Sequence, residues 1–313
     1  MDIRIIEVPF ELAAGTVGAS LGVEALKAVA IAQDSDFFWE HERDSVAVGE
    51  PLLYPHNLYD YARYIDQVTD VVKKTAESVA GALKAGCFPV VLAGDHSTAV
   101  GSIAGVINAY PDAKIGVIWI DAHTDLNSPF TTTSGNVHGM SLAAVCGIDN
   151  YENKRQDVDE ETTRLWENMK ELAGAGKVKL EDVVFLGTRD IEEEEALLVE
   201  NAGLKIYQVT EFQPDNIEKK LEQALLKLDH CDKIYVSFDV DSLDPSVSVG
   251  TGTPVEGGFK HQTVKSINKV LVSNEKVCCW EMAEINPLLD HKNRMAESGF
   301  DILQEVVLTI KKR

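Results

Sequence analysis

Three metal-binding side chains stand at alternate positions directly after an apolar run. Asp121, His123 and Asp125 follow Ile115 to Ile120, a run typical of a buried parallel strand. Alternate side chains of an extended chain point to the same side, so these three can converge on one point. Because ligand sites in open α/β sheets form beyond the carboxyl ends of the strands, this triplet predicts a metal-binding or catalytic site there.

Two further segments carry the same kinds of residue at a predicted strand end. His96 follows one apolar run, and Asp239 and Asp241 follow another. Oxygen-rich ligation with some imidazole suits manganese, magnesium or iron better than a structural zinc, which prefers thiolate. Six ligands exceed the needs of one ion, so we expect two ions about 3.5–4 Å apart that share carboxylates. Taken singly, His96 also fits a turn histidine, and the two aspartates also fit a capping pair.

The elements that must hold these residues alternate between strands and helices. This alternation predicts a single-domain, three-layer α-β-α fold with a central, mostly parallel sheet. No repeat, low-complexity linker or break in composition divides the chain, so we expect one domain over residues 1–313. The strands are expected at 3–8, 88–92, 115–120, 183–186, 205–208, 233–238 and 277–282, and the main helices at 23–32, 58–85, 97–110, 142–146, 162–172, 217–228, 261–272 and 300–311.

Composition narrows the partners and the compartment. The 313 residues carry a net charge of −22, which argues against nucleic acid or an anionic membrane as partner. The same charge favours a cationic substrate mildly, although a solvated acidic surface explains it equally well. Five cysteines without C-x-x-C spacing argue against a disulfide framework. With no secretory signal or membrane-spanning run in the sequence, we expect a cytoplasmic protein.

Three segments resemble the metal-binding motifs of the ureohydrolases, the arginase and agmatinase family. They are Ala93-Gly94-Asp95-His96-Ser97, Asp121-Ala122-His123-Thr124-Asp125, and Ser237-Phe238-Asp239-Val240-Asp241 followed by Leu243-Asp244-Pro245. The resemblance covers most of the chain. The long loop from Asn127 to Gly139 is similar to that of arginase in particular, and Thr251-Gly252-Thr253-Pro254 and Glu284-Ile285-Asn286-Pro287 agree with it.

The resemblance implies an arginase-like fold and two Mn²⁺ ions per chain. One manganese would be held by His96 and Asp125 and the other by His123 and Asp241, with Asp121 and Asp239 shared. A hydroxide between the metals would attack the guanidinium carbon of L-arginine and yield L-ornithine and urea.

Further roles follow from the same resemblance. Asp125 would pass a proton to the departing amine, Glu284 would pair with the guanidinium, and His138 would shuttle protons to water. Thr253 would line the guanidinium pocket, although a turn-capping role fits it equally well. The family also implies a homo-oligomer, a trimer or hexamer, but Gln262 and Thr263 stand where some arginases have an interface Arg-Glu pair.

The far end of the substrate is where this sequence departs from the family. The resemblance implies that Asn127 and Ser134 bind the α-carboxylate, with Thr132 and Asn136 nearby, and that Asp190 and the last position of Arg189-Asp190-Ile191-Glu192 face the α-amine. That last position is usually Asp, and here it is Glu192. It opens a run of four acids, 192–195, that is most often a solvated helix start.

Several alternative functions stay open from the sequence. An agmatinase, or another guanidino-acid hydrolase, fits the metal motifs, but agmatine lacks the carboxylate that the Asn127–Ser134 loop would read. A catalytically degenerate ureohydrolase that acts as a binding partner is a further possibility. A single-zinc amide hydrolase of the deacetylase kind lacks one histidine–aspartate pair, so His96 and Asp125 together argue against it.

Overall fold

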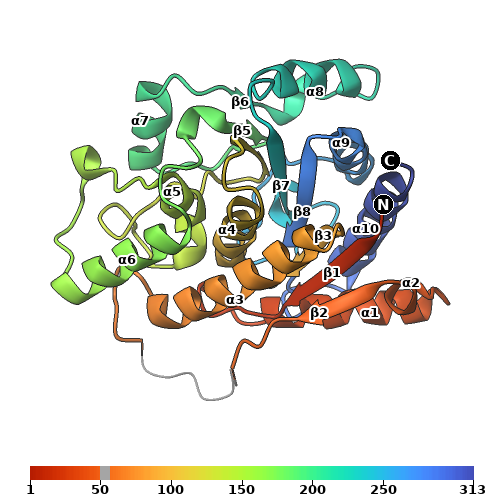
Figure 1. Ribbon diagram of the computed structural model, residues 1–313, viewed down its shortest axis with the longest axis horizontal. Helices are drawn as coiled ribbons and strands as arrows, with labels where there is room; N and C mark the ends of the chain where they lie inside the picture. The colour runs from red at the N-terminus through yellow and green to blue at the C-terminus, as the bar shows by residue number, and fades with distance from the viewer. Residues whose placement is uncertain (50–56) are drawn as a thin grey trace.

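The computed structural model describes residues 1–49 and 57–313, and its centre is an eight-stranded sheet in the order β2-β1-β3-β8-β7-β4-β5-β6 (Figure 1). Every pairing between these strands is parallel. The strands are β1 (Ile3–Val8), β2 (Glu42–Ser45), β3 (Phe88–Ala93), β4 (Ile115–Ile120), β5 (Val183–Leu186), β6 (Ile206–Tyr207), β7 (Lys233–Asp239) and β8 (Val277–Ala283).

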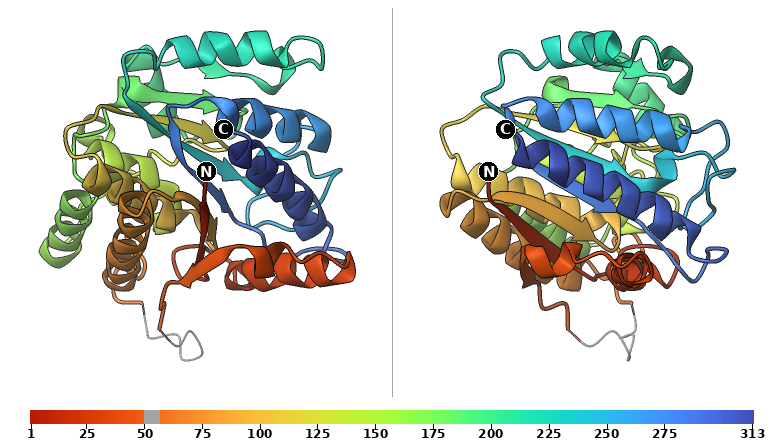
Figure 2. Two further views of the ribbon diagram at one scale, coloured as in Figure 1. Left: turned by 45° about the vertical axis from the view of Figure 1, so that its right-hand side comes forward. Right: turned by 90° about the vertical axis from the view of Figure 1, so that its right-hand side faces the viewer.

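Helices cover both faces of the sheet (Figure 2). One apolar core joins the sheet to α3 (Ile65–Lys84), α4 (Ala99–Ala109), α5 (Ser141–Cys146), α6 (Glu160–Leu172) and α7 (Glu193–Asn201). The other joins it to α1 (Gly22–Ala32), α2 (Phe37–Glu40), α8 (Ile217–Leu226), α9 (His261–Ser273) and α10 (Arg294–Lys311). The predicted three-layer α-β-α fold is therefore confirmed.

The central strands are apolar throughout because both of their faces are buried. In β4, Val117 and Trp119 pack into the core with α3 and α4, whereas Ile118 and Ile120 pack into the core with α9 and α10. All six residues of this strand are buried. Its side chains therefore anchor the position at which the chain leaves the sheet at Asp121.

Helix α3 begins at Ile65, seven residues later than its apolar pattern predicts. Two local features explain the delay. Tyr64 has a left-handed backbone with φ of 56°, and the Asn57 side-chain oxygen accepts hydrogen bonds from the backbone N–H groups of Tyr59 and Tyr64. The Arg63 N–H donates to the carbonyl of Gly135 at 2.8 Å. This segment is thus held as turns against the Asn127–Gly139 loop and not as helix.

Two other boundaries also differ from expectation. Strand β2 was not predicted because its sequence, Glu-Arg-Asp-Ser, is charged; it lies at the sheet edge, where charged residues are common, and Arg4 of β1 forms ion pairs with Glu42 and Asp44. Helix α10 begins at Arg294, earlier than the predicted start at Phe300. Over the described residues, none of the helices has the length and apolarity needed to cross a membrane.

Candidate active site

The sequence-predicted site residues gather at one edge of the sheet. They follow β3, β8, β7, β4 and β5, which are five consecutive strands in the observed order. Since the strands are parallel, their carboxyl ends meet at this edge. The distances between their side chains, given below, show how closely these residues lie to one another.

A tight turn brings His96 into the site directly after β3. A Cβ built on Gly94 would lie 1.9 Å from the carbonyl oxygen of Phe10, so only glycine fits here. The Asp95 carboxylate accepts hydrogen bonds from the backbone N–H groups of Ser97, at 3.1 Å, and Ala13, at 2.9 Å. The Asp95 side chain therefore holds the turn through Ser97 on one side and through the segment around Ala13 on the other.

The His96 ring is oriented for ligation by its surroundings. It stacks on Trp119 with ring centres 4.2 Å apart, and its Nε2 lies 2.7 Å from the hydroxyl of Ser237. Its Nδ1 lies 3.0–3.1 Å from carboxylate oxygens of Asp121, Asp125 and Asp239, yet it has hydrogen-bond geometry with none of them. A histidine held through one nitrogen while the other faces carboxylates is typical of a metal ligand.

A second group adjoins the first and shares Asp121 with it. His123 Nδ1 lies 3.0 Å from Asp241 Oδ2 and 3.4 Å from Asp121 Oδ1, while its Nε2 lies 3.6 Å from Asp190 Oδ2. Each of the sets His96/Asp121/Asp239 and Asp121/His123/Asp241 has one ligand atom per residue within 4.8 Å of the others. Asp125 belongs to neither compact set, although it lies beside His96.

The carboxylates divide their two oxygens between backbone and site. One oxygen accepts a backbone N–H: Asp121 from His123 at 2.7 Å, Asp239 from Asp241 at 2.8 Å, and Asp241 from Ala122 at 3.1 Å. The other oxygen, Oδ2 in each case, faces a histidine nitrogen. Burial, and then repulsion from Asp241 and Asp121, raises the pKa of Asp239 well above its ordinary value. Such a buried set of carboxylates and imidazoles fits hard divalent cations of the Mn²⁺ or Mg²⁺ kind.

Two site residues have strained backbones. Asp125 and Glu284 have φ angles of 51° and 70°, and a non-glycine residue in this region costs on the order of 1–3 kcal/mol. Hydrogen bonds hold both segments in place: Glu284 N–H donates to the Gly94 carbonyl at 2.7 Å, and the Asp125 carbonyl accepts from Leu142 N–H at 3.0 Å. Strain of this kind is concentrated at functional sites.

Glu284, which is buried, and His138, which is partly buried, form a pair next to His96. Glu284 Oε1 accepts from the His96 backbone N–H at 2.9 Å and lies 2.9 Å from His138 Nδ1. Burial disfavours the charged imidazole, but the hydrogen bond and charge of Glu284 outweigh it and raise the pKa of His138 to about 9.

A cavity of about 320 Å³ opens onto these groups. All the site residues predicted from sequence line it except Asp121 and Glu284, and Gly139 and Glu195 complete the lining. The lining residues predicted from sequence are His96, His123, Asp125, Asn127, Thr132, Ser134, Asn136, His138, Asp190, Glu192, Asp239, Asp241 and Thr253.

The loop from Asn127 to Gly139 forms one wall and is fixed at several points. Its two ends are joined by the Asn127 N–H, which donates to the Gly139 carbonyl at 3.1 Å. The Gln156 side chain donates to the carbonyls of Pro129 and Thr132. Gly135 has φ of 73° and packs so closely that an added Cβ would lie 2.0 Å from the Asp60 carbonyl oxygen. These contacts fix the shape of the wall.

Polar groups of this wall also bond to one another. The hydroxyl of Thr132 accepts from the Gly135 N–H at 3.0 Å, that of Ser134 accepts from the Asn136 N–H at 3.2 Å, and the Asn136 side-chain oxygen accepts from Arg63 at 3.3 Å. Across the cavity, Thr253 donates its hydroxyl hydrogen to Asp241 Oδ2 at 3.0 Å. Thr253 thus contacts a candidate metal ligand directly.

The acid run 192–195 is a helix start, as predicted, but it is not solvated throughout. Glu192 accepts hydrogen bonds from the Thr133 hydroxyl at 2.7 Å and from the Asn127 side chain at 3.4 Å. Glu194 and Glu195 are buried. Glu194 pairs with Arg155 at 2.8 Å. The expectation of a solvated face was wrong for these two residues because α7 packs against the loop that carries the site.

Three residues of the site had no predicted role: Trp119, Ser237 and Glu195. Trp119 and Ser237 orient His96, as described above. Glu195 accepts hydrogen bonds from the Thr124 hydroxyl at 2.5 Å and from the Leu126 N–H at 2.9 Å. Burial raises the pKa of Glu195 to about 7, although these hydrogen bonds act to lower it. The usable signal was a polar Ser237 inside an otherwise apolar strand, two residues before Asp239.

Comparison with known proteins agrees with this geometry. The model of the arginase family matches residues 1–309. Arginases from Brevibacillus brevis and Bacillus subtilis are each 31% identical to the chain, over 97% of both sequences. The crystal structure of Bacillus caldovelox arginase superposes with a TM-score of 0.82 at 29% identity, over 97% of both chains. This chain is a ureohydrolase enzyme and belongs to the arginase family.

Proposed function

We propose that this enzyme hydrolyses L-arginine to L-ornithine and urea with two Mn²⁺ ions. The observation that carries the proposal is the pairing of the two His-Asp sets around Asp121 with a cavity wall of amide and hydroxyl groups. The first feature suits activation of water, and the second suits recognition of an amino acid. Relatives named arginase at 31% identity support the same substrate.

The residues present fit a pair of manganese ions. His96 and Asp125 would hold one, His123 and Asp241 the other, and Asp121 and Asp239 would be shared. When bound, two such cations lower the pKa of water enough to supply hydroxide near neutral pH. The hydroxyl of Ser237 lies 2.7 Å from Nε2 of His96 and so keeps that ring oriented, and the carboxylate of Asp190 lies 3.6 Å from Nε2 of His123.

The remaining chemistry falls to three side chains. Glu284 pairs with the guanidinium, a contact between a fixed carboxylate and a planar cation that sets the orientation of the carbon under attack. Asp125 passes a proton to the departing amine nitrogen. His138, in contact with Glu284, transfers protons between the site and bulk water, a role that suits histidine.

The opposite end of the cavity would read the amino-acid part of the substrate. The Asn127 amide and the Ser134 hydroxyl would donate to the α-carboxylate, with Thr132 and Asn136 beside them. Glu192 and Asp190 would face the α-amine, and Thr253 would line the guanidinium end. Because the loop is fixed by its own hydrogen bonds, little ordering is needed when the substrate binds.

The length of the Glu192 side chain supports a second candidate function, the hydrolysis of another guanidino compound. Its carboxylate already contacts Thr133 and Asn127, and it is one methylene longer than the aspartate usual in the family. A guanidino acid of different length would then fit the cavity better than arginine. Agmatine, which lacks the carboxylate, leaves the Asn127 and Ser134 groups without a substrate partner.

We also propose a cytoplasmic homo-oligomer, a trimer or hexamer. All five cysteines are free thiols, which suits a reducing compartment. The oligomer is proposed from family membership, and the subunit count is open to measurement by sedimentation.

A substrate panel tests the proposed activity. Arginine, agmatine, homoarginine, canavanine and guanidinobutyrate are assayed for urea release after manganese activation. We expect arginine to have the highest specificity constant. A higher value for agmatine or guanidinobutyrate would replace arginine by the second candidate.

A further inference from the structure

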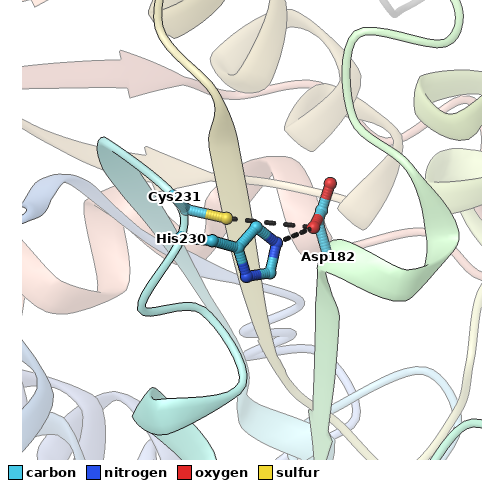
Figure 3. Close-up of side chains that lie close together, drawn as sticks. All are labelled: Asp182, His230 and Cys231. Carbon is cyan, nitrogen blue, oxygen red and sulfur yellow. Dashed lines mark hydrogen bonds and ion pairs between the residues drawn. The ribbon is translucent and has the colours of Figure 1, made fainter.

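A second cluster of metal-binding side chains lies at the opposite end of the strands that carry the active site. Asp182 directly precedes β5, and His230 and Cys231 lie in the connection between α8 and β7 (Figure 3). These are the amino ends of their strands, whereas the candidate active site is at the carboxyl ends. The cluster therefore has no part in the proposed arginine hydrolysis.

The three side chains converge on one carboxylate oxygen. His230 Nε2 lies 2.6 Å from Asp182 Oδ1, and Cys231 Sγ lies 3.9 Å from the same oxygen. Figure 3 marks both contacts with dashed lines that end at Asp182. The three ligand atoms lie within 4.8 Å of one another. Zinc binds nitrogen, oxygen and sulfur at about 2.0–2.3 Å, so shifts on the order of 1 Å would let all three contact one ion.

The surroundings leave the Asp182 charge incompletely paired. Asp182 is fully buried, and its Oδ2 has no hydrogen-bond partner. The only lysine that pairs with it among the described residues is Lys114, whose Nζ lies 3.3 Å from Oδ1. A buried carboxylate is costly unless its charge is paired and its oxygens are hydrogen-bonded. A bound cation would meet that need better than the half-exposed lysine does.

The donor set distinguishes this cluster from the active site. It contains a thiol, an imidazole and a single carboxylate, which suit a borderline-soft ion such as Zn²⁺ better than Mn²⁺. Burial and the charge of Asp182 raise the pKa of the Cys231 thiol to about 11. The thiol is therefore protonated in the metal-free protein, and binding would release one proton to solvent as the thiolate–metal bond forms.

We propose that Asp182, His230 and Cys231 form a structural zinc site, with water as the fourth ligand. The site is reachable because the His230 side chain is 47% exposed. An ion there would tie the start of β5 to the α8–β7 connection, two segments that are 48 residues apart at Asp182 and His230. Because an ion that binds only the folded state stabilises it, the melting temperature would rise with the logarithm of the zinc concentration once that concentration exceeds Kd.

Cobalt(II) is the sharpest probe because a cobalt–thiolate bond produces a charge-transfer absorption band that oxygen and nitrogen ligands do not. Among the described residues the candidate active site holds no cysteine, so cobalt that enters it gives no such band. Manganese-saturated protein is titrated with CoCl2. We expect the band to saturate at one equivalent per chain and to disappear when zinc is added.

Variants assign the band to the cluster. Cys231→Ser should abolish it, and His230→Ala, at an exposed position, should weaken cobalt binding by at least about tenfold. Cys87→Ser is the matched control, since Cys87 is a free thiol outside the cluster, and it should retain the band. Circular dichroism confirms that each variant is folded. No band in the native protein, or a band that survives in folded Cys231→Ser, would overturn the proposal.

Discussion

The two ends of strands β4, β5 and β7 carry two different kinds of site. At the carboxyl ends, hard carboxylates and imidazoles come from short motifs, and Asp125 has a left-handed backbone, as does Glu284 after the neighbouring strand β8. At the amino ends, a thiol, an imidazole and one carboxylate come together from distant segments, and none of Asp182, His230 and Cys231 has a positive φ. Strain accompanies the edge where we propose catalysis, and relaxed geometry accompanies the edge where we propose a structural ion.

The two proposed sites lie at opposite ends of the same strands. Strand β4 has six residues and strand β7 has seven, and nearly all of them are buried. A short, buried strand fixes the distance between its two ends, while each end carries its own set of side chains. Each of the variants described next changes a residue at the carboxyl edge, and we expect it to change metal binding or catalysis at that edge.

The largest effect is expected from removal of a metal ligand. His123→Ala or Asp241→Ala should leave about one manganese per chain and lower turnover roughly 1000-fold, because a catalytic metal contributes several kcal/mol. Elemental analysis and a urea assay measure both quantities. His291→Ala, which changes an exposed histidine that does not line the cavity, is the control. Two manganese ions and native turnover in His123→Ala would contradict the ligand assignment.

The next effect concerns substrate choice at the rim of the carboxyl edge. The specificity constant for arginine should exceed that for agmatine by about two to three orders of magnitude. A site that hydrogen-bonds a substrate group rejects an analogue without it by up to ~10,000-fold or more, and water at the open cavity softens the penalty. Asn127→Ala should reduce the preference. Comparable specificity constants for arginine and agmatine in the native enzyme would mean that the Asn127–Ser134 loop has only a structural role.

A smaller effect is expected at His138. His138→Ala should lower turnover by about 100-fold, the lower end of the range for general acid–base groups, with both manganese ions retained. Added imidazole should restore part of the loss because it replaces the missing proton carrier. If the variant loses metal instead, His138 is a ligand and the proton-transfer role is wrong.

The smallest effect is expected at Glu192. Glu192→Asp removes one methylene beside the α-amine, and it should lower the Michaelis constant for arginine by up to about tenfold with little change in turnover. Steady-state kinetics separate the two constants. Glu193→Asp, a neighbouring exposed position, is the matched control. A lower turnover in Glu192→Asp would mean that its length matters for the reaction itself and not only for binding.

The residues of the carboxyl edge could be proposed from sequence alone because their signals are local. Asp121, His123 and Asp125 follow one another at alternate positions, and each predicted strand ends directly before its polar residues. The strand order could not be predicted in the same way. It depends on packing between distant segments, and it is this order that makes β3, β8, β7, β4 and β5 neighbours.

The contacts that support the site were beyond the sequence for the same reason. The orientation of His96 depends on Trp119 and Ser237, which lie on two other strands. The burial of Glu195 depends on the fold of the loop beneath α7. At the amino edge, Asp182 lies 48 residues before His230, and no spacing rule joins them.

The central claim is that the carboxyl edge binds two manganese ions and uses them to hydrolyse arginine. The most direct test is urea release from L-arginine, measured as manganese is added back to metal-free enzyme and bound manganese is counted in the same samples. We expect turnover to rise with manganese occupancy and to saturate at two ions per chain. Saturation at one ion, or no urea from arginine at full occupancy, would contradict it.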